Sequence, residues 1–358
     1  MNLQNLVREN IRRLTPYSSA RKEFAGNAEI FLDANENSFG SPLPVAYNRY
    51  PDPLQMEIKA KIAARENVRT GEIFIGNGSD EAIDLLFRIF CEPRRDNVLI
   101  CPPTYGMYEV SAAINDTAVK RANLTADFRL DSRAIENERD AQTKLLFICS
   151  PNNPTGNAFD RAEILELAKN FGGIVAVDEA YIHFSSRQSL LDEINDLPNL
   201  VVLQTFSKAW GLAGLRVGLA FANEEIIALF NKVKPPYNVS QIAQKAVLDA
   251  LENRQAVEKT IAEIISERER LIENLEKFSF VKKIYPTDAN FVLVKTADAD
   301  FVYKFLLEEK IVVRNRNNVE LCEGCLRITV GTPDENRSLL AALSKSQSLA
   351  ASGREKDF

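Results

Sequence analysis

Short, continuously apolar runs recur along the chain from about residue 72 to residue 223. Helical patterns such as SDEAIDLLFRIF (79–90) and DRAEILELAKNFG (160–172) separate several of them. An uninterrupted apolar run is typical of a strand buried on both faces of a parallel sheet. The pattern therefore predicts an α/β fold with a mostly parallel sheet, and functional residues are expected where the strands end. The runs are EIFIGNG, NVLICPP, KLLFICSPNNPTG, GGIVAVDEAY, NLVVLQTFSK and VGLAFAN.

The character of the pattern changes after residue 240. A long amphipathic helix is predicted over roughly 240–277, and we interpret it as a linking helix that packs on the core. The strand candidates KKIYP, NFVLVKT, KIVVRN and LRITV follow, interleaved with helices that begin near Asp298 and Pro333. The predicted organisation is an N-terminal arm (1–42), a large domain (43–240), the linking helix with a small α+β domain (241–346) and a polar tail (347–358).

Composition narrows the classes of function. The chain has 358 residues and a net charge of −6, which argues against a nucleic-acid or membrane-surface role. No apolar run approaches the length of a membrane span, and the opening MNLQNLVRENIRR carries charges where a signal peptide has an apolar core. We expect a cytoplasmic protein that binds small molecules.

The cysteines and the histidine give weak signals. Five cysteines include one CxxC pair, Cys322 and Cys325, and a zinc site would need two further ligands. The chain has one histidine, His183, and no second CxxC pair, so we expect reduced thiols and no metal. No serine or cysteine motif surrounds His183, and a packing role is favoured over a catalytic one.

Glycines, aromatic rings and amides gather where the predicted strands end. GNGSDE (76–81) joins a strand to a helix and predicts either a phosphate site at the helix N-terminus or an ordinary tight turn. Tyr105 follows two prolines and could stack on a flat ligand or only pack in a turn. Asn153, in SPNNPTG, could present its amide to a ligand oxygen or only shape the turn.

Two charged residues stand at the ends of apolar runs. Asp178 follows GGIVAV, and a buried carboxylate there needs a cationic partner, either a ligand or a Lys or Arg elsewhere. Lys208, in TFSKAWGLAGLR (205–216), has apolar neighbours that would lower its pKa and make it a usable nucleophile and base. Together with the phosphate loop, the ring and Arg216, these residues predict a site for pyridoxal phosphate (PLP).

The same segments carry a family resemblance. TFSKAWGLAGLR resembles the lysine motif of the class II aminotransferases of fold type I, and GNGSDE, SPNNPTG and VDEAY occur in the order of that family. RLTPYSSAR, LDANEN, NRYPDP, CPPTYGMYEV and LRITVGT are similar to histidinol-phosphate aminotransferases. The resemblance runs from about residue 5 to residue 343. It implies a large PLP-binding domain with a mostly parallel seven-stranded sheet, and an N-terminal arm that joins the small domain and a dimer contact.

The resemblance also implies a role for individual residues. Lys208 would hold the cofactor, Asp178 would face its pyridine nitrogen, and Tyr105 would stack on its ring. Asn153 and Tyr181 would reach the ring hydroxyl, with Tyr181 counted among the catalytic residues. The residues implied around the phosphate are Gly78, Ser79, Asp80, Ser207 and Arg216, with Tyr50 reaching the cofactor of the partner subunit. Those implied near the substrate are Arg327 and Arg314 for its anionic group, and Tyr17, Asn35 and Asn238.

The function implied is transamination between L-histidinol phosphate and 2-oxoglutarate, which gives imidazole acetol phosphate and glutamate in histidine biosynthesis. The implied assembly is a homodimer. Two enzymes of the same fold remain as alternatives, namely an aromatic amino-acid aminotransferase and an amino-acid-phosphate decarboxylase. A PLP-binding regulator without turnover is a further alternative. It would normally need an added DNA-binding domain, and no basic helical segment flanks the core.

Overall fold

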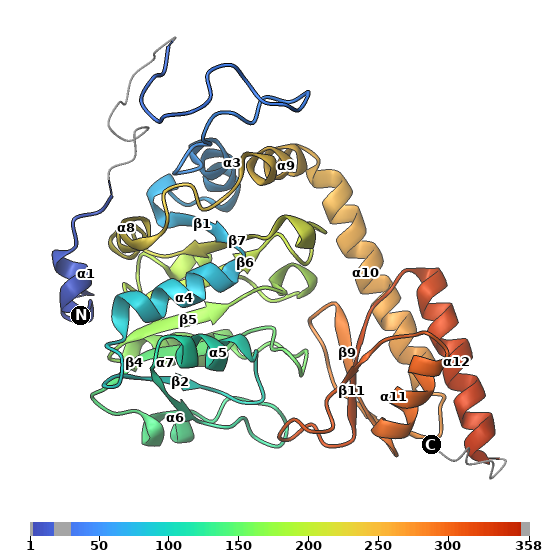
Figure 1. The fold of residues 1–358 in the computed structure, drawn as a ribbon. Helices are drawn as coiled ribbons and strands as arrows, with labels where there is room; N and C mark the ends of the chain where they lie inside the picture. The colour runs from blue at the N-terminus through green and yellow to red at the C-terminus, as the bar shows by residue number, and fades with distance from the viewer. Residues whose placement is uncertain (1–2, 18–29, 352–358) are drawn as a thin grey trace.

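The computed structural model describes residues 3–17 and 30–351. A large domain contains most of the chain, and a small domain lies beside it at the far end of the long helix α10 (Arg254–Leu275) (Figure 1). Among the described residues, no helix is both long and apolar enough to cross a membrane.

The large domain is built on a seven-stranded sheet with the strand order β1-β7-β6-β5-β4-β2-β3. The five strands from β3 to β6 in that order are parallel, whereas β7 runs antiparallel to both of its neighbours, β1 and β6. This arrangement confirms the predicted fold class. The strands are β1 (Ile73–Asn77), β2 (Asn97–Ile100), β3 (Ala118–Arg121), β4 (Thr143–Cys149), β5 (Ile174–Asp178), β6 (Leu200–Thr205) and β7 (Val217–Phe221).

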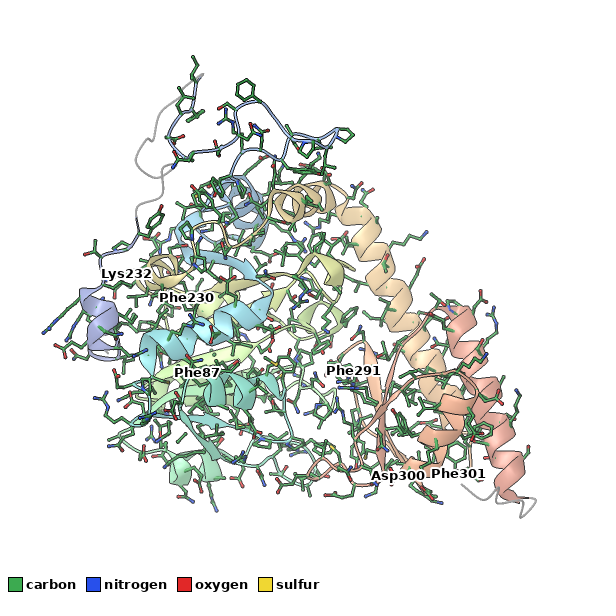
Figure 2. All side chains as sticks on the ribbon, in the orientation of Figure 1. Phe87, Phe230, Lys232, Phe291, Asp300 and Phe301 are labelled. Carbon is green, nitrogen blue, oxygen red and sulfur yellow. The ribbon has the colours of Figure 1, made fainter. Side chains whose placement is uncertain are left out.

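Helices cover both faces of this sheet, which explains the uninterrupted apolar runs. In β4, Leu146 and Ile148 belong to one apolar cluster, while Leu145 and Phe147 belong to the cluster on the opposite face. The first cluster includes residues of α3 (Met56–Glu66), α6 (Ser132–Glu138), α7 (Arg161–Asn170) and α9 (Gln241–Glu252). The second includes residues of α1 (Glu9–Arg13), α4 (Ser79–Phe90), α5 (Met107–Ile114) and α8 (Glu224–Val233), and Phe87 and Phe230, labelled in Figure 2, are among its members.

The small domain has a four-stranded antiparallel sheet in the order β10-β11-β9-β8. Its apolar cluster joins the sheet to α10, α11 and α12, which lie together in Figure 1. The elements are β8 (Val281–Ile284), β9 (Phe291–Thr296), α11 (Ala299–Glu308), β10 (Arg314–Asn315), β11 (Cys325–Thr329) and α12 (Pro333–Ala351). Short 3-10 helices occur at Leu3–Asn5, Thr70–Glu72, Ile182–Phe184, Leu191–Glu193 and Ala213–Leu215.

Two element boundaries differ from the sequence analysis. The helix predicted over 240–277 is two helices, because the chain leaves the helical conformation at Asn253, between α9 and α10. The last helix, α12, continues to Ala351, so residues 347–351 of the expected polar tail extend it. Residues 352–358 lie outside the described part of the chain.

The described start of the N-terminal arm packs on the large domain, although the sequence analysis joins the arm to the small one. Leu3, Val7 and Ile11 recur every four residues and are buried in the same cluster as Phe90 and Phe230. The backbone N–H of Arg8 donates to the carbonyl of Ile89 at 2.9 Å. Residues 18–29 of the arm lie outside the described part of the chain.

The loop before α4 is held against the sheet by a glycine in β7. A Cβ atom on Gly218 would lie 2.0 Å from the backbone nitrogen of Ser79 and 2.3 Å from the carbonyl carbon of Gly78. Both are backbone atoms, so no side-chain rotation could relieve the contact. The absence of a side chain at Gly218 therefore fixes where α4 begins relative to the sheet.

We expect Gly218→Ala to destabilise the protein, because the added methyl group forces β7 and the Gly78–Ser79 loop apart. The expected loss is about 1–3 kcal/mol in the free energy of unfolding, measured by urea denaturation and circular dichroism. Gly172→Ala is the matched control, because a Cβ atom there meets no other atom within 4 Å. Equal stability of the two variants would contradict this account of the loop.

Candidate active site

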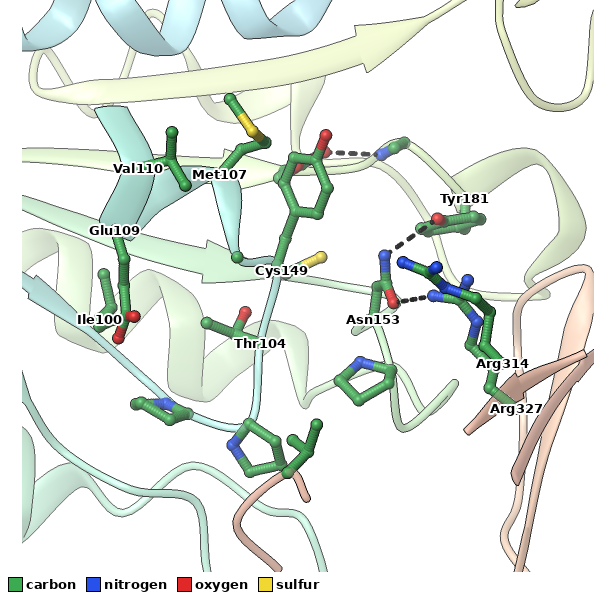
Figure 3. A pocket seen from close by; sticks show the side chains of 18 of the residues that line it. Ile100, Thr104, Met107, Glu109, Val110, Cys149, Asn153, Tyr181, Arg314 and Arg327 are labelled. Atoms are coloured by element: carbon green, nitrogen blue, oxygen red, sulfur yellow. Dashed lines mark hydrogen bonds between the residues drawn. The ribbon is translucent and has the colours of Figure 1, made fainter. Parts of the chain in front are cut away.

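A pocket of about 730 Å³ opens where the parallel strands end, between the two domains. The large domain contributes the loops after its strands, and the small domain contributes side chains from β10 and β11. Many of the residues expected from the sequence line this pocket, and Figure 3 shows several of them at close range. The expected residues that line it are Ser79, Asp80, Tyr105, Asn153, Asp178, Tyr181, Ser207, Lys208, Arg216, Arg314 and Arg327.

Lys208 lies in the turn that follows β6, with its side chain open to the pocket. Its Nζ is 5.5 Å from the centroid of the Tyr181 ring. The pKa of Lys208 is lowered. The first cause is loss of water around the amine, although the side chain is still accessible from the pocket, and the second is the positive charge of Arg327. A lowered pKa increases the fraction of neutral amine at neutral pH, as a nucleophile or base requires.

Asp178 ends the central strand β5 and is buried. Its carboxylate accepts hydrogen bonds from the Tyr108 hydroxyl at 2.8 Å and from the backbone N–H of Ala180 at 3.1 Å. Burial raises the pKa of Asp178 despite these two donors. It forms no salt bridge with any Lys or Arg of the described residues, so the structural alternative left open by the sequence finds no support there.

Tyr108 has no assigned role in the sequence analysis. It lies on α5 and is completely buried, and its ring packs against Phe147 of β4 at a centroid distance of 4.6 Å. That packing directs the hydroxyl to Asp178. The sequence alone does not reveal this contact, because nothing in CPPTYGMYE distinguishes the two tyrosines chemically. Only the packing of α5 on the sheet brings Tyr108 to Asp178.

One side of the pocket can hold an anion. The side chain of Arg216 donates to Ser207 Oγ at 3.4 Å and to Asp80 Oδ2 at 3.3 Å, and the Tyr105 hydroxyl donates to Asp80 Oδ1 at 3.1 Å. The N-terminus of α4 begins at Ser79 beside them, with its free N–H groups and its partial positive charge. A Cβ atom on Gly78, which has φ +76°, would come within 2.8 Å of Arg216 Nη2.

On the opposite side of the pocket, the side-chain amide of Asn153 contacts residues of both domains. Asn153 Nδ2 donates to the Tyr181 hydroxyl at 3.3 Å, and Arg327 Nη1 of the small domain donates to Asn153 Oδ1 at 2.5 Å (Figure 3). The guanidinium of Arg327 also lies over the ring of Phe291, 5.1 Å from its centroid. Burial and the neighbouring Arg316 lower the pKa of Arg327, but an arginine remains charged.

Five of the expected residues lie outside this pocket in the described chain. Gly78 is next to it, and Asn35 is exposed in the segment before α3. Asn238 donates to Ile75 O and Glu81 Oε2 at 3.0 Å each and accepts from Lys234 Nζ at 3.0 Å. Tyr17 and Tyr50 line a separate cavity of about 1330 Å³ beside α8, where Tyr50 stacks on the ring of Tyr237.

The weak candidates from the sequence lie elsewhere. His183 packs edge-on against Trp210, and burial lowers its pKa to about 4, so it is neutral at pH 7. Cys322 and Cys325 are buried free thiols, and burial raises their pKa values to about 12 and about 11. No cluster of His, Cys, Asp and Glu within the described residues could hold a metal ion.

The residues of the pocket fit PLP. The group at Arg216, Ser207 and the start of α4 suits a phosphate, and the ring of Tyr105 offers a flat surface beside it. Asp178 is a buried carboxylate that forms no salt bridge within the described part of the chain, which suits a protonated ring nitrogen. Lys208 supplies an amine with a lowered pKa in the same pocket.

A family model described as "Aminotransferase class I and II" matches residues 43–343. The chain belongs to that family. The match includes every strand of the large sheet and of the small sheet. It therefore agrees with the family resemblance drawn from the lysine motif.

Individual relatives of this aminotransferase give the same picture. A histidinol-phosphate aminotransferase of Parabacteroides distasonis is 52% identical over 342 residues, covering 96% of this chain and 98% of its own. The crystal structure of the histidinol-phosphate aminotransferase from Clostridium acetobutylicum superposes with a TM-score of 0.78 at 26% identity, covering 84% of this chain and 91% of its own. That from Sinorhizobium meliloti, in complex with pyridoxal-5'-phosphate, gives a TM-score of 0.77 at 24% identity, covering 88% and 90%.

Next to Asp178, the aminotransferase buries a second carboxylate that does not line the pocket. Glu179 accepts hydrogen bonds from Ser189 Oγ, the backbone N–H of Leu190 and Gln204 Nε2 at 2.5, 2.8 and 3.1 Å. It thereby ties β6 and the chain near residue 190 to the end of β5. Burial raises the pKa of Glu179 to about 7.

This raised pKa makes stability depend on pH. Between the ordinary value near 4.5 and about 7, the folded protein keeps a proton on Glu179 that the unfolded chain has released. Stability therefore falls as the pH rises through that window, by up to about 3 kcal/mol.

We expect Glu179→Gln, which cannot ionise, to lose less stability than the wild type between pH 5 and pH 8. Urea denaturation at the two pH values measures the difference. Glu166→Gln, on the exposed side of α7, is the control and should leave the pH dependence unchanged. An unchanged dependence in Glu179→Gln would mean that this carboxylate does not titrate in the window.

Proposed function

We propose that this aminotransferase is a PLP-dependent histidinol-phosphate aminotransferase of histidine biosynthesis. It transfers the amino group of L-histidinol phosphate to 2-oxoglutarate, and the products are imidazole acetol phosphate and glutamate. The observation that carries the proposal is a single pocket that combines Lys208, the buried Asp178 and two small-domain arginines, Arg314 and Arg327. The relative of that name with 52% identity supports the choice of substrate.

Residues of the large domain would hold the cofactor. Arg216, Ser207, Ser79 and the start of α4 would bind its phosphate, and Tyr105 would lie against its ring. When bound, PLP supplies an electron-withdrawing ring that stabilises the charge left on a carbon atom after its proton is removed. Asp178 would keep a proton on the ring nitrogen, because a cation beside a buried carboxylate stabilises its charged form.

Lys208 has two tasks in this proposal. Its amine would hold the cofactor covalently before substrate binds, and once free it would take the proton from the substrate carbon that bears nitrogen. The lowered pKa suits both tasks, since each needs a neutral amine. Tyr181 and Asn153, joined by their hydrogen bond, would orient the ring hydroxyl of the cofactor.

Arg327 and Arg314 would bind the anionic end of each substrate in turn. A guanidinium can grip a phosphate or a carboxylate through paired hydrogen bonds. One anion site therefore serves both the phosphate ester and the keto diacid, as an exchange in two half-reactions requires. The Nε atom of Arg327 is buried without a partner in the described residues, so a further acceptor can still bind it.

A substrate panel tests the proposal. The PLP-saturated protein should form glutamate from 2-oxoglutarate with histidinol phosphate, and kcat/KM should fall about a hundredfold or more with unphosphorylated histidinol. Lys208→Ala should lose about 10²–10⁴-fold or more of the turnover and all cofactor that borohydride can fix to the chain. Equal use of histidinol and aromatic amino acids would replace the proposal with a broad aromatic aminotransferase. Release of CO₂ from an amino-acid phosphate would identify a decarboxylase, and binding without turnover a regulator.

We also propose that the protein is a homodimer in which Tyr50 completes the cofactor site of the partner subunit. Tyr50 does not line the pocket of its own chain, and it lies with Tyr17 and Leu14 along the separate cavity beside α8. Several large apolar side chains in this region are exposed in the single chain. They are Leu14, Tyr17, Ile30, Leu32, Phe39, Leu43, Val45, Tyr47, Tyr50 and Met56. A surface of this kind is typical of an interface between subunits.

Subunit mixing tests the shared site. A dimer of one Tyr50→Phe chain and one Lys208→Ala chain should contain one site with wild-type affinity for PLP, because the intact Lys208 then meets the partner's intact Tyr50. A dimer of a wild-type chain and a chain carrying both substitutions should bind PLP about tenfold or more weakly at its one active site, since a hydrogen bond to phosphate is lost. The reverse pattern would show that Tyr50 acts within its own chain.

We assign the reaction to the cytoplasm. All five cysteines are free thiols in the described chain, as is usual in a reducing compartment. The proposed substrates are small, water-soluble and charged.

A further inference from the structure

The small domain presents three arginines on one face of its sheet. Arg314 of β10 and Arg327 of β11 are direct partners across an antiparallel pair, so their side chains share a face. Arg316 comes two residues after Arg314, and its backbone N–H donates to the carbonyl of Cys325 at 2.9 Å, which continues the pairing. Alternation along the strand therefore directs Arg316 to the same face. All three line the pocket that contains Lys208, and Figure 3 shows Arg314 and Arg327 together beside Asn153.

These three guanidinium groups place like charges on one face of the small sheet. Of the described residues, no Asp or Glu forms a salt bridge with Arg314, Arg316 or Arg327. Arg327 donates to Asn153, and the Nε atoms of Arg316 and Arg327 are buried without any partner in that part of the chain. Like charges directly opposite each other on a sheet are destabilising, and a third charge adds to the cost. Such a cluster is stable in one pocket when a ligand supplies the negative charge.

The neighbouring groups do not supply that charge. Tyr181 and Cys322 are close to Arg316, but burial raises the pKa of each, so both are neutral at pH 7. Asp178 and Glu320 also line the pocket, but within the described residues neither forms a salt bridge with the three arginines; Asp178 accepts a hydrogen bond from Tyr108, and Glu320 accepts one from Asn123 at 2.5 Å. Burial, and second the charge of Arg314, lower the pKa of Arg316, in agreement with the strand pairing that places the arginines side by side.

We propose that Arg316 makes the anion site selective for a doubly charged phosphate ester over singly charged groups. The inference rests on the proposed function and adds to it a specificity residue. A carboxylate has one charge and two oxygens, and the fork of Arg327 can satisfy both. A phosphate ester has nearly two negative charges and three acceptor oxygens. After Arg327 has bound two of the oxygens, the third oxygen and the second charge can interact with Arg316. Histidinol phosphate should therefore depend on Arg316 more than 2-oxoglutarate does.

The direct test measures binding to the PLP-loaded protein with two ligands of one shape, propyl phosphate and propyl sulfate. At pH 8 the phosphate ester has about two negative charges and the sulfate ester one. Calorimetry should find that the wild type binds the phosphate ester at least about tenfold more tightly. Arg316→Gln should weaken the phosphate ester about 10- to 100-fold and the sulfate ester less than about threefold.

Two further variants control for folding. Arg316→Lys keeps the charge and should retain most of the preference for the phosphate ester. Arg337→Gln removes an exposed arginine from α12 of the same domain, outside the pocket, and should leave both affinities unchanged. Equal thermal unfolding midpoints and equal PLP content would establish that the variants are folded.

The kinetic counterpart separates the two half-reactions. In Arg316→Gln, kcat/KM should fall about 10- to 100-fold for histidinol phosphate and less than about threefold for 2-oxoglutarate. The inference would be overturned if Arg316→Gln lost equal affinity for both esters, or equal kcat/KM for both substrates. Arg316 would then act only by general electrostatic attraction or by supporting the structure. A wild type that prefers the phosphate ester but does not transaminate histidinol phosphate would overturn the proposed function instead.

Discussion

The active site depends on a carboxylate that the fold buries at the end of its central strand. Asp178 has two hydrogen-bond donors, Tyr108 and the backbone of Ala180, and it forms no salt bridge with a Lys or Arg among the described residues, although Lys208 acts on it at longer range. Burying a charge in this way is unfavourable unless an opposite charge joins it. The parallel sheet creates the position, because the ends of neighbouring strands open together into one pocket. The ligand that completes the charge balance therefore binds at the end of the central strand of the sheet.

The rest of the pocket balances this negative group with positive ones. Lys208 and Arg216 come from the large domain, and the arginines of β10 and β11 come from the small domain. The hydrogen bonds of Asn153 to Tyr181 and Arg327 join the two sets. Repulsion among these cations favours the neutral form of the Lys208 amine, since Arg327 helps to lower its pKa. An anion bound at Arg327 would weaken that repulsion and so couple substrate binding to the basicity of the amine.

Much of this arrangement is predictable from the sequence because it follows from local patterns. Continuous apolar runs predict the buried strands, and the residues just after them, such as Asp178 and Lys208, line the pocket. Contacts between distant segments are harder to predict. Tyr108 reaches Asp178 only after α5 packs on β4, and Glu179 gains its three donors only in the folded chain. Arg316 could have been found from its spacing of two residues from Arg314, but the predicted strand KIVVRN stops one residue before it.

The two parts of the pocket rest on different hydrophobic clusters. The residues that would hold the cofactor stand on the two clusters of the large domain, whereas the arginine-bearing strands stand mainly on the separate cluster of the small domain. Most of the packing behind the arginine wall is therefore separate from the packing behind Asp178 and Lys208, although Leu293 and Cys325 of the small domain belong to the first cluster of the large domain. Evolution can exchange one substrate for another on this scaffold while the chemistry stays constant, and protein engineers can follow the same route.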